Sequence, residues 1–258
     1  MSLPSAASSK LSISLLLSGS LIVGWVVTLV AALSAIGADT PGWIVTAAVL
    51  VRTQLQTGLF IVAHDAMHRL LWPGRPRRND AFGVVALALY AGLPFAACRQ
   101  QHQRHHQLPG SSHDPDFPGD QRAGVLGWYR QFMARYLSLA QTLRLVIAWM
   151  ALIAFSMAAL HRPALDAAQH VLQFATLPLL LSSLQLFVFG TYLPHRVQRF
   201  PERRSHPTSL DLPPWLSLLV CFHFGYHREH HDNPALSWYE LPRARARNLA
   251  LTVPGYLQ

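Results

Sequence analysis

Three clusters of histidine, with one further histidine standing alone, are the residues of this sequence most suited to chemistry. The clusters are formed by His64 and His68, by His102, His105 and His106, and by His227, His230 and His231. Within each cluster, spacings of three or four residues place the imidazoles on one face of a helix. His223 comes one turn before the third cluster and is expected on the same helix face, and His195 stands alone after Pro194. Because neutral imidazole binds transition metals, this pattern predicts a shared metal site.

The number of these histidines predicts two metal ions rather than one. Ten imidazoles exceed the roughly four to six ligands that a single transition metal takes. Imidazole suits iron, copper, nickel and zinc alike, so the ligand type does not select the metal. Four nearby carboxylates could accept hydrogen bonds from ligating imidazoles and fix their tautomers. These carboxylates belong to Asp65, Asp114, Asp116 and Glu229.

Four apolar stretches are the elements that must position the histidines. The composition, 51% hydrophobic and 13% charged, is typical of a membrane protein rather than a soluble one. A transmembrane helix needs about 20 apolar residues, and this length predicts spans over residues 11–37, 43–64, 142–160 and 171–193. Two shorter apolar runs, 81–97 and 215–224, are expected to lie in the interface or to re-enter the membrane. The predicted fold class is an all-α integral membrane protein with four transmembrane helices and a histidine-rich, two-metal cap.

Polar residues interrupt the second of these spans. Arg52, Gln54 and Gln56 would be costly in hydrocarbon unless they face protein or water. We therefore expect Arg52 to be hydrogen-bonded to helix carbonyls or to line a cavity.

The basic residues predict how the chain lies in the membrane. With four spans, the loops on one side cover residues 38–42 and 161–170 and contain a single basic residue, Arg162. All other Lys and Arg residues except Arg52 fall on the opposite face, which the positive-inside rule makes cytoplasmic. Both termini and all histidine clusters are expected on this cytoplasmic face. The net charge of +9 is scattered over these segments and forms no compact basic domain, so no nucleic-acid partner is expected. Neither cytoplasmic section has enough apolar residues for a core of its own, so residues 1–258 are expected to form a single domain.

Other classes of metal protein fit the pattern less well. A zinc protease requires glutamate directly after its first helical histidine, whereas Asp65 follows His64. A bis-histidine haem needs only roughly two to four ligands, which leaves most of the histidines unexplained. A histidine-rich metal transporter is the non-enzyme alternative. A cation path should carry acidic groups within its spans, however, and the predicted spans have none before their cytoplasmic ends.

The order of these motifs resembles the membrane fatty-acid desaturase and hydroxylase superfamily. An HxxxH cluster is followed by two HxxHH clusters, on four spans with an extra histidine before the last cluster. Within that superfamily the sequence is similar to the bacterial and cyanobacterial β-carotene ketolases, from about residue 54 to residue 231. The segments that carry this resemblance are residues 58–68, 73–77, 113–117, 184–196 and 216–231.

The resemblance implies a di-iron oxygenase with nine histidine ligands and His223 as a further candidate. The nine are His64, His68, His102, His105, His106, His195, His227, His230 and His231. Such an enzyme would activate O2 at two Fe(II) ions with electrons from a reduced ferredoxin-type donor, and would oxidise C4 of a β-ionone ring. Two hydroxylations at this carbon would give a geminal diol, which loses water to leave a ketone. The carotenoid would reach the site from the lipid bilayer.

Two positions depart from the pattern of these ketolases. Arg69 stands where the family usually has glycine, and residues 237–242 follow its tryptophan-rich ending only loosely. Because neither position is a predicted ligand, the departures bear on substrate preference more than on chemistry. The alternative within the enzyme class is a membrane lipid or fatty-acid desaturase or hydroxylase that shares the metal site.

Overall fold

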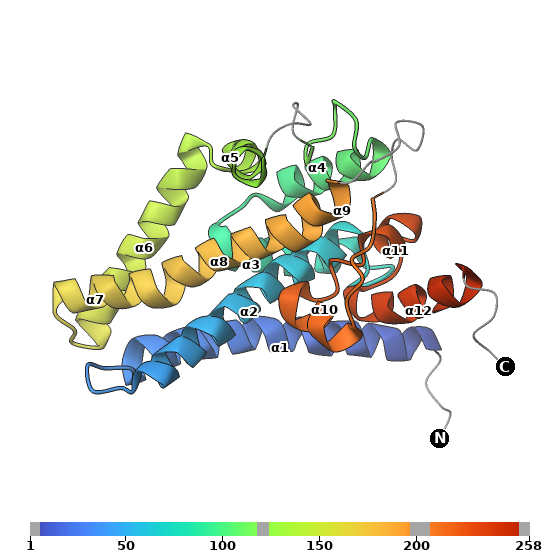
Figure 1. The fold of residues 1–258 in the computed structure, drawn as a ribbon. Coiled ribbons are helices and arrows are strands. Elements are labelled where there is room, and N and C mark those ends of the chain that lie inside the picture. Colours follow the sequence, from blue (N-terminus) through green and yellow to red (C-terminus); the bar gives the residue numbers. More distant parts are fainter. Residues whose placement is uncertain (1–5, 118–123, 197–206, 253–258) are drawn as a thin grey trace, which may run out of the picture.

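The fold is a bundle of long helices joined at one end to a cap of shorter helices (Figure 1). The computed structural model describes residues 6–117, 124–196 and 207–252, and all regular secondary structure in these residues is helical. Helix α1 (Ala6–Ala35) packs along α2 (Gly42–Met67), which also packs against α8 (Leu177–Leu186). Four segments are long and apolar enough to cross a membrane, and they correspond to the four expected spans. These segments are Ser9–Ala35, Gly42–Met67, Leu139–Ala159 and Ala164–His195.

The fourth of these segments begins earlier than the sequence predicts. It contains α7 (Ala164–Val171), η1 (Leu172–Thr176), α8, η2 (Phe187–Tyr192) and α9 (Leu193–His195), with η1 and η2 π-helical. The expectation of a loop over residues 161–170 is therefore wrong from Ala164 onward. Pro163 precedes the helix, and Asp166 in its first turn pairs with Arg162 at 2.6 Å. A carboxylate in the first turn stabilises a helix start.

Arg52 ties three helical segments together inside the bundle. Its side chain is almost completely buried, with Nε donating to the carbonyl of Phe174 at 3.0 Å and Nη1 to the carbonyl of Trp25 at 2.6 Å. The guanidinium also lies over the Trp25 ring, 4.6 Å from its centroid. The expectation that Arg52 bonds to helix carbonyls is confirmed, and its side chain joins α2 to α1 and η1.

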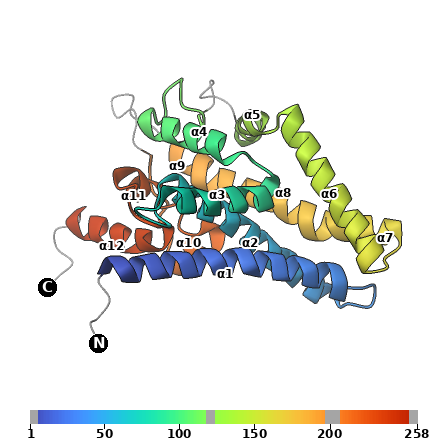
Figure 2. The same cartoon turned by 180° about the vertical axis from the view of Figure 1, so that it is seen from behind.

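The cap consists of the shorter helices that follow the second and fourth of these segments (Figure 2). Helices α3 (Pro76–Ala91) and α4 (Phe95–Gln107) meet at a bend of 100°, where Gly92 adopts a left-handed φ of 66°. This bent pair covers the run over residues 81–97 that the sequence places in the interface or in a re-entrant segment. The rest of the cap is α10 (Pro214–Cys221), α11 (His227–Asp232) and α12 (Leu241–Thr252).

Helix α6 (Leu139–Ala159) packs against the other long segments through its C-terminal half, where Trp149 and Ile153 contact the cluster of Leu29, Leu33 and Val171. It follows α5 (Val125–Tyr136) and leans away from α2 and α8 in both views (Figures 1 and 2). Only 6% of its most apolar window is buried inside the protein, against 39% for α2. A helix that is apolar all round and so little covered by protein is suited to contact lipid.

The end of α2, which carries the first histidine cluster, is fixed by a left-handed turn. His68 closes the helix and Arg69 adopts a φ of 62°, so that the amide of Leu70 donates back to the carbonyl of Asp65 at 3.0 Å. Asn79 of α3 is fully buried, and its Nδ2 donates to a carbonyl in the last turn of α2 at 2.7 Å. These two contacts hold the histidines of α2 in place.

Arg69→Gly is expected to stabilise the fold by about 1 kcal/mol, because a left-handed conformation strains a residue that has a Cβ atom and does not strain glycine. Thermal unfolding in detergent measures this effect, and the midpoint should rise by about 2–4 °C. Arg69→Ala is the matched control, since it removes the same side chain but keeps the strained backbone. Equal midpoints for the two variants would show that backbone strain is not the cause.

Candidate metal centre

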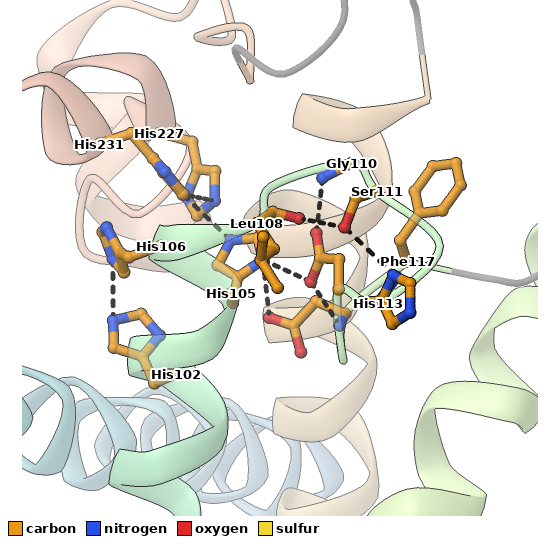
Figure 3. A network of polar contacts seen from close by, with 12 residues as sticks. His102, His105, His106, Leu108, Gly110, Ser111, His113, Phe117, His227 and His231 are labelled. Carbon is orange, nitrogen blue, oxygen red and sulfur yellow. Dashed lines mark hydrogen bonds and ion pairs between the residues drawn. The ribbon is translucent and has the colours of Figure 1, made fainter.

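Nine of the ten predicted imidazoles gather into two groups at the cap end of the bundle. Within each group, the candidate ligand nitrogens lie within 4.8 Å of one another. The first group is His64, His68, His102, His106 and His230, and the second is His105, His195, His227 and His231. Figure 3 shows how members of both groups on α4 and α11 face one another. Each group could hold one metal ion.

Helical spacing explains how the clusters are divided between the groups. On α4, His102 and His106 are four residues apart and join the first group, whereas His105 joins the second. Helix α11 shows the reverse, because its pair His227 and His231 joins the second group and His230 joins the first. An α-helix has about 3.6 residues per turn, so a step of three residues falls short of a full turn and a step of four goes past it. An HxxHH cluster therefore offers two edges of one helix face, and each edge reaches a different group.

Ring nitrogens converge within and between these helices. The shortest distances between Nε2 atoms join His68 with His102 at 2.7 Å, His106 with His230 at 2.8 Å and His105 with His231 at 3.0 Å. Nε2 of His64 and Nε2 of His195, one in each group, are buried and have no hydrogen-bond partner. Buried polar atoms normally have a partner. Nitrogen atoms left without one, and gathered around common points, fit two transition-metal ions.

The electrostatics at His227 and His230 also favour metal binding. Burial, assisted by the neighbouring imidazoles, holds the pKa of His227 and the pKa of His230 well below the usual range for histidine. Both rings are therefore neutral near pH 7 and each keeps a lone pair available for a metal. A cation bound between such rings meets no competing positive charge from them.

Of the four predicted carboxylates, that of Asp114 is the one that accepts a hydrogen bond from a histidine of the two groups. Its Oδ1 lies 2.8 Å from Nδ1 of His105, and its carboxylate also accepts from the amides of Gly110 and Asp116. Burial opposes ionisation, but the bond to His105 and these two amides lower the pKa of Asp114 below its usual value. The charged carboxylate fixes the tautomer of His105, so that its Nε2 faces the metal group.

The other three predicted carboxylates have different surroundings. Asp116 comes no closer than 3.9 Å to Nδ1 of His105, and Asp65 lies 3.7 Å from Nδ1 of His64. Glu229 bonds to Ser209 and to Arg245 instead of to a histidine. Its carboxylate therefore fastens α11 to the segment before α10 and to α12.

His223 lies outside both groups. Phe222 and His223 both adopt left-handed conformations, with φ values of 47° and 64°, so α10 ends there and α11 begins only at His227. The prediction that His223 shares a helix face with the third cluster is therefore wrong. Its ring instead stacks on that of Tyr226, with centroids 5.7 Å apart, and we leave it out of the proposed ligand set.

Phe224 is a site residue that the sequence did not single out. Its ring centroid lies 4.8 Å from that of His64, 5.4 Å from that of His227 and 6.2 Å from that of His230. Gly190 of η2 makes room for it, since a Cβ atom on Gly190 would lie 2.2 Å from the ring. A phenylalanine that packs against metal-binding histidines cannot be recognised from the sequence, because aromatic residues are common in apolar cores.

Asp114→Asn is expected to weaken metal binding by about 10- to 100-fold, the usual cost of losing a residue that hydrogen-bonds to a metal ligand. The amide is uncharged and can turn its NH2 group toward His105, which would favour the wrong tautomer. Metal content of the purified protein, titrated against free metal, measures the loss. Asp232→Asn on the exposed side of α11 is the matched control. Equal affinities in the two variants would contradict the role given to Asp114.

Comparisons with known proteins match nearly the whole chain. The family model for fatty acid desaturase covers residues 41–146 and 120–257. A "Beta-carotene ketolase" of Paracoccus sp. (strain N81106 / MBIC 01143) is 39% identical over 91% of this chain and 93% of its own length. A second "Beta-carotene ketolase", of Paracoccus sp. (strain PC1), is 43% identical over 75% of this chain and 76% of its own length. A "Zeaxanthin 4-ketolase" of Chlamydomonas reinhardtii is 36% identical over 90% of this chain and 51% of its own length.

Proposed function

The chain belongs to the fatty acid desaturase family, and we propose that within this family it is a β-carotene ketolase. The observation that carries this conclusion is the 39% identity to a β-carotene ketolase over almost the full length of both chains. The substrate is then a carotenoid, and the product carries a ketone at C4 of a β-ionone ring. From β-carotene, oxidation of one ring gives echinenone and oxidation of both rings gives canthaxanthin.

Nine histidines would hold the metals that this reaction requires. The ligand set would be the first group of five imidazoles and the second group of four. The metals they would hold are two Fe(II) ions. Bound iron supplies the ability to activate O2 with electrons from a reduced ferredoxin-type donor. The protein contributes neutral imidazoles at fixed positions, and Asp114 orients His105 toward the second group. The long helices provide a rigid frame for these ligands.

The chemistry of the ketone follows from two hydroxylations at one carbon. In each, a C–H bond of C4 is replaced by C–OH, and one O2, two electrons and two protons are converted into the new hydroxyl and one water. The C4 hydrogens are allylic, so their bonds are weak. A carbon with two hydroxyl groups loses water to leave the ketone, and this last step needs no oxidant.

The apolar substrate suits a site in a membrane protein. We place the four long helices across the bilayer, with the termini and the histidine groups on the cytoplasmic side. Nearly all Lys and Arg residues lie in the segments that follow the second and fourth spans, which supports this orientation. A carotenoid dissolved in the lipid could then reach the metals without crossing water.

Pigment analysis of bacteria that make β-carotene and express this chain tests the proposal. Chromatography with mass spectrometry should detect products in which one or two ring CH2 groups have become C=O. The number of keto groups shows whether one ring or both are oxidised. If well-expressed, iron-loaded protein leaves β-carotene unchanged, the function is wrong, and a membrane lipid desaturase or hydroxylase with the same metal site becomes the better assignment.

A further inference from the structure

Two neighbouring cavities lie along the inner side of α6. One has a volume of about 410 Å³ and the other about 300 Å³. Five residues line both of them, so the two cavities share a wall and follow one another along the helix. The shared residues are Tyr90, Ala91, Leu145, Trp149 and Leu179, contributed by α3, α6 and α8.

The cavities offer an apolar surface with few unpaired polar groups. Gln56 accepts from Nε1 of Trp25 at 2.6 Å and donates to the carbonyl of Tyr90. Gln141 donates to the carbonyl of Ala91, and Ser183 bonds to the hydroxyl of Tyr129 at 2.6 Å. Arg144 also lines the first cavity, and its Nη1 donates to Oε1 of Gln141 at 3.3 Å. Because these polar groups already have partners, a polar ligand would gain few new hydrogen bonds in exchange for those it makes with water. The chemistry of the walls selects a hydrocarbon.

Two aromatic rings lie between the second cavity and the metal centre. Phe60 lines this cavity and lies four residues before His64 on α2, so both point from the same helix face. The centroid of Phe60 is 5.7 Å from that of Tyr90 and 6.4 Å from that of Phe224. Phe224 in turn lies 4.8 Å from His64. An apolar path of adjoining groups therefore runs from the cavities to the first histidine group.

The other wall of the cavities faces the bilayer. Leu145 and Trp149 come from α6, the long helix that is least covered by protein. The adjacent residues Ile147 and Met150 are exposed, and in a membrane they would contact lipid. Between α6 and the pair α3 and α8, a long apolar molecule could pass from the lipid into the cavities without losing apolar contact.

We infer that the two cavities along α6 form the binding channel for the carotenoid, with one ring at Phe60, on the side nearest the histidines, and the polyene along Tyr90, Leu145 and Leu179. This inference rests on the proposed function, because the occupant is the substrate named there. The cavities fit this occupant in three respects: their walls are mostly apolar, they adjoin along α6, and the second is lined by Phe60, whose ring neighbours the Phe224 ring beside His64.

Filling the channel tests this inference. Leu179→Trp on α8 and Leu145→Trp on α6 place an indole in the channel from opposite walls. Leu181→Trp and Ile147→Trp make the same type of change on the exposed sides of these helices, and serve as matched controls. The variants are purified in detergent from cells that make β-carotene. Carotenoid retained per protein is read from absorbance, iron per protein is measured, and the keto products of the cells are quantified.

The channel variants should retain at least about 10-fold less carotenoid than their controls, because overfilling an apolar site costs enough to lower affinity by that factor. Their iron content should match that of the controls, since the histidines are untouched. If Leu179→Trp and Leu145→Trp retain as much carotenoid as the controls, the channel lies elsewhere. If the unaltered protein forms no keto-carotenoid, the proposed function fails instead, and the two failures are distinguishable.

Discussion

Replacing His105 by alanine is expected to lower ketone formation by more than about 100-fold and to remove one of two metal ions. Losing a residue that hydrogen-bonds to a metal ligand already lowers metal affinity or activity by about 10- to 100-fold, and losing the ligand itself lowers them further. His105 is the single contribution of α4 to the second group, which has four imidazoles and would keep only three. Keto-carotenoid yield and iron per protein should therefore fall together.

His113→Ala is the matched control for this variant. His113 lies on the same side of the molecule but is exposed and belongs to neither group. Its loss should leave yield and iron unchanged. If His105→Ala keeps full iron and full yield, the division of the imidazoles into a five-member and a four-member group does not describe the metal site.

The positions of most site residues were predictable from the sequence because helical spacing is strict. An HxxxH or HxxHH pattern places its imidazoles on one face whatever the surrounding fold, so the clusters at His64, His102 and His227 indicate a common site. The apolar stretches are equally direct, since a bilayer requires spans of about 20 residues. Which histidine joins which group was not predictable, because that depends on how α4 and α11 are rotated against each other.

The failures of prediction occurred where the backbone leaves regular geometry. His223 was expected on the helix face of the third cluster, but the left-handed residues at 222 and 223 turn the chain between α10 and α11. Residues 164–170 were expected in a loop, although they form the first turns of the fourth long segment. The contact between Gly190 and Phe224 also has no signature in the sequence, since it joins residues that are far apart along the chain.

Gly190→Ala is expected to lower ketone formation by about 100-fold without removing any ligand. The new Cβ atom would lie 2.2 Å from the ring of Phe224, whereas ordinary contacts begin near 3.4 Å, so the ring must move by roughly 1 Å. That ring packs against His64, His227 and His230, and a displacement of this size at a reacting site costs about 100-fold in rate. Keto-carotenoid yield at equal expression measures the loss.

A second substitution separates this clash from other effects of altering η2. Phe224→Leu removes the ring, and the double variant Gly190→Ala with Phe224→Leu should recover part of the yield, because the clash no longer exists. Gly19→Ala on α1 is the control for adding a methyl group to a long helix, since nothing lies within 4 Å of its Cβ position. Strictly additive losses in the double variant would mean that Gly190 acts independently of Phe224. Recovery would show that the glycine is required because the ring beside the histidines needs its space.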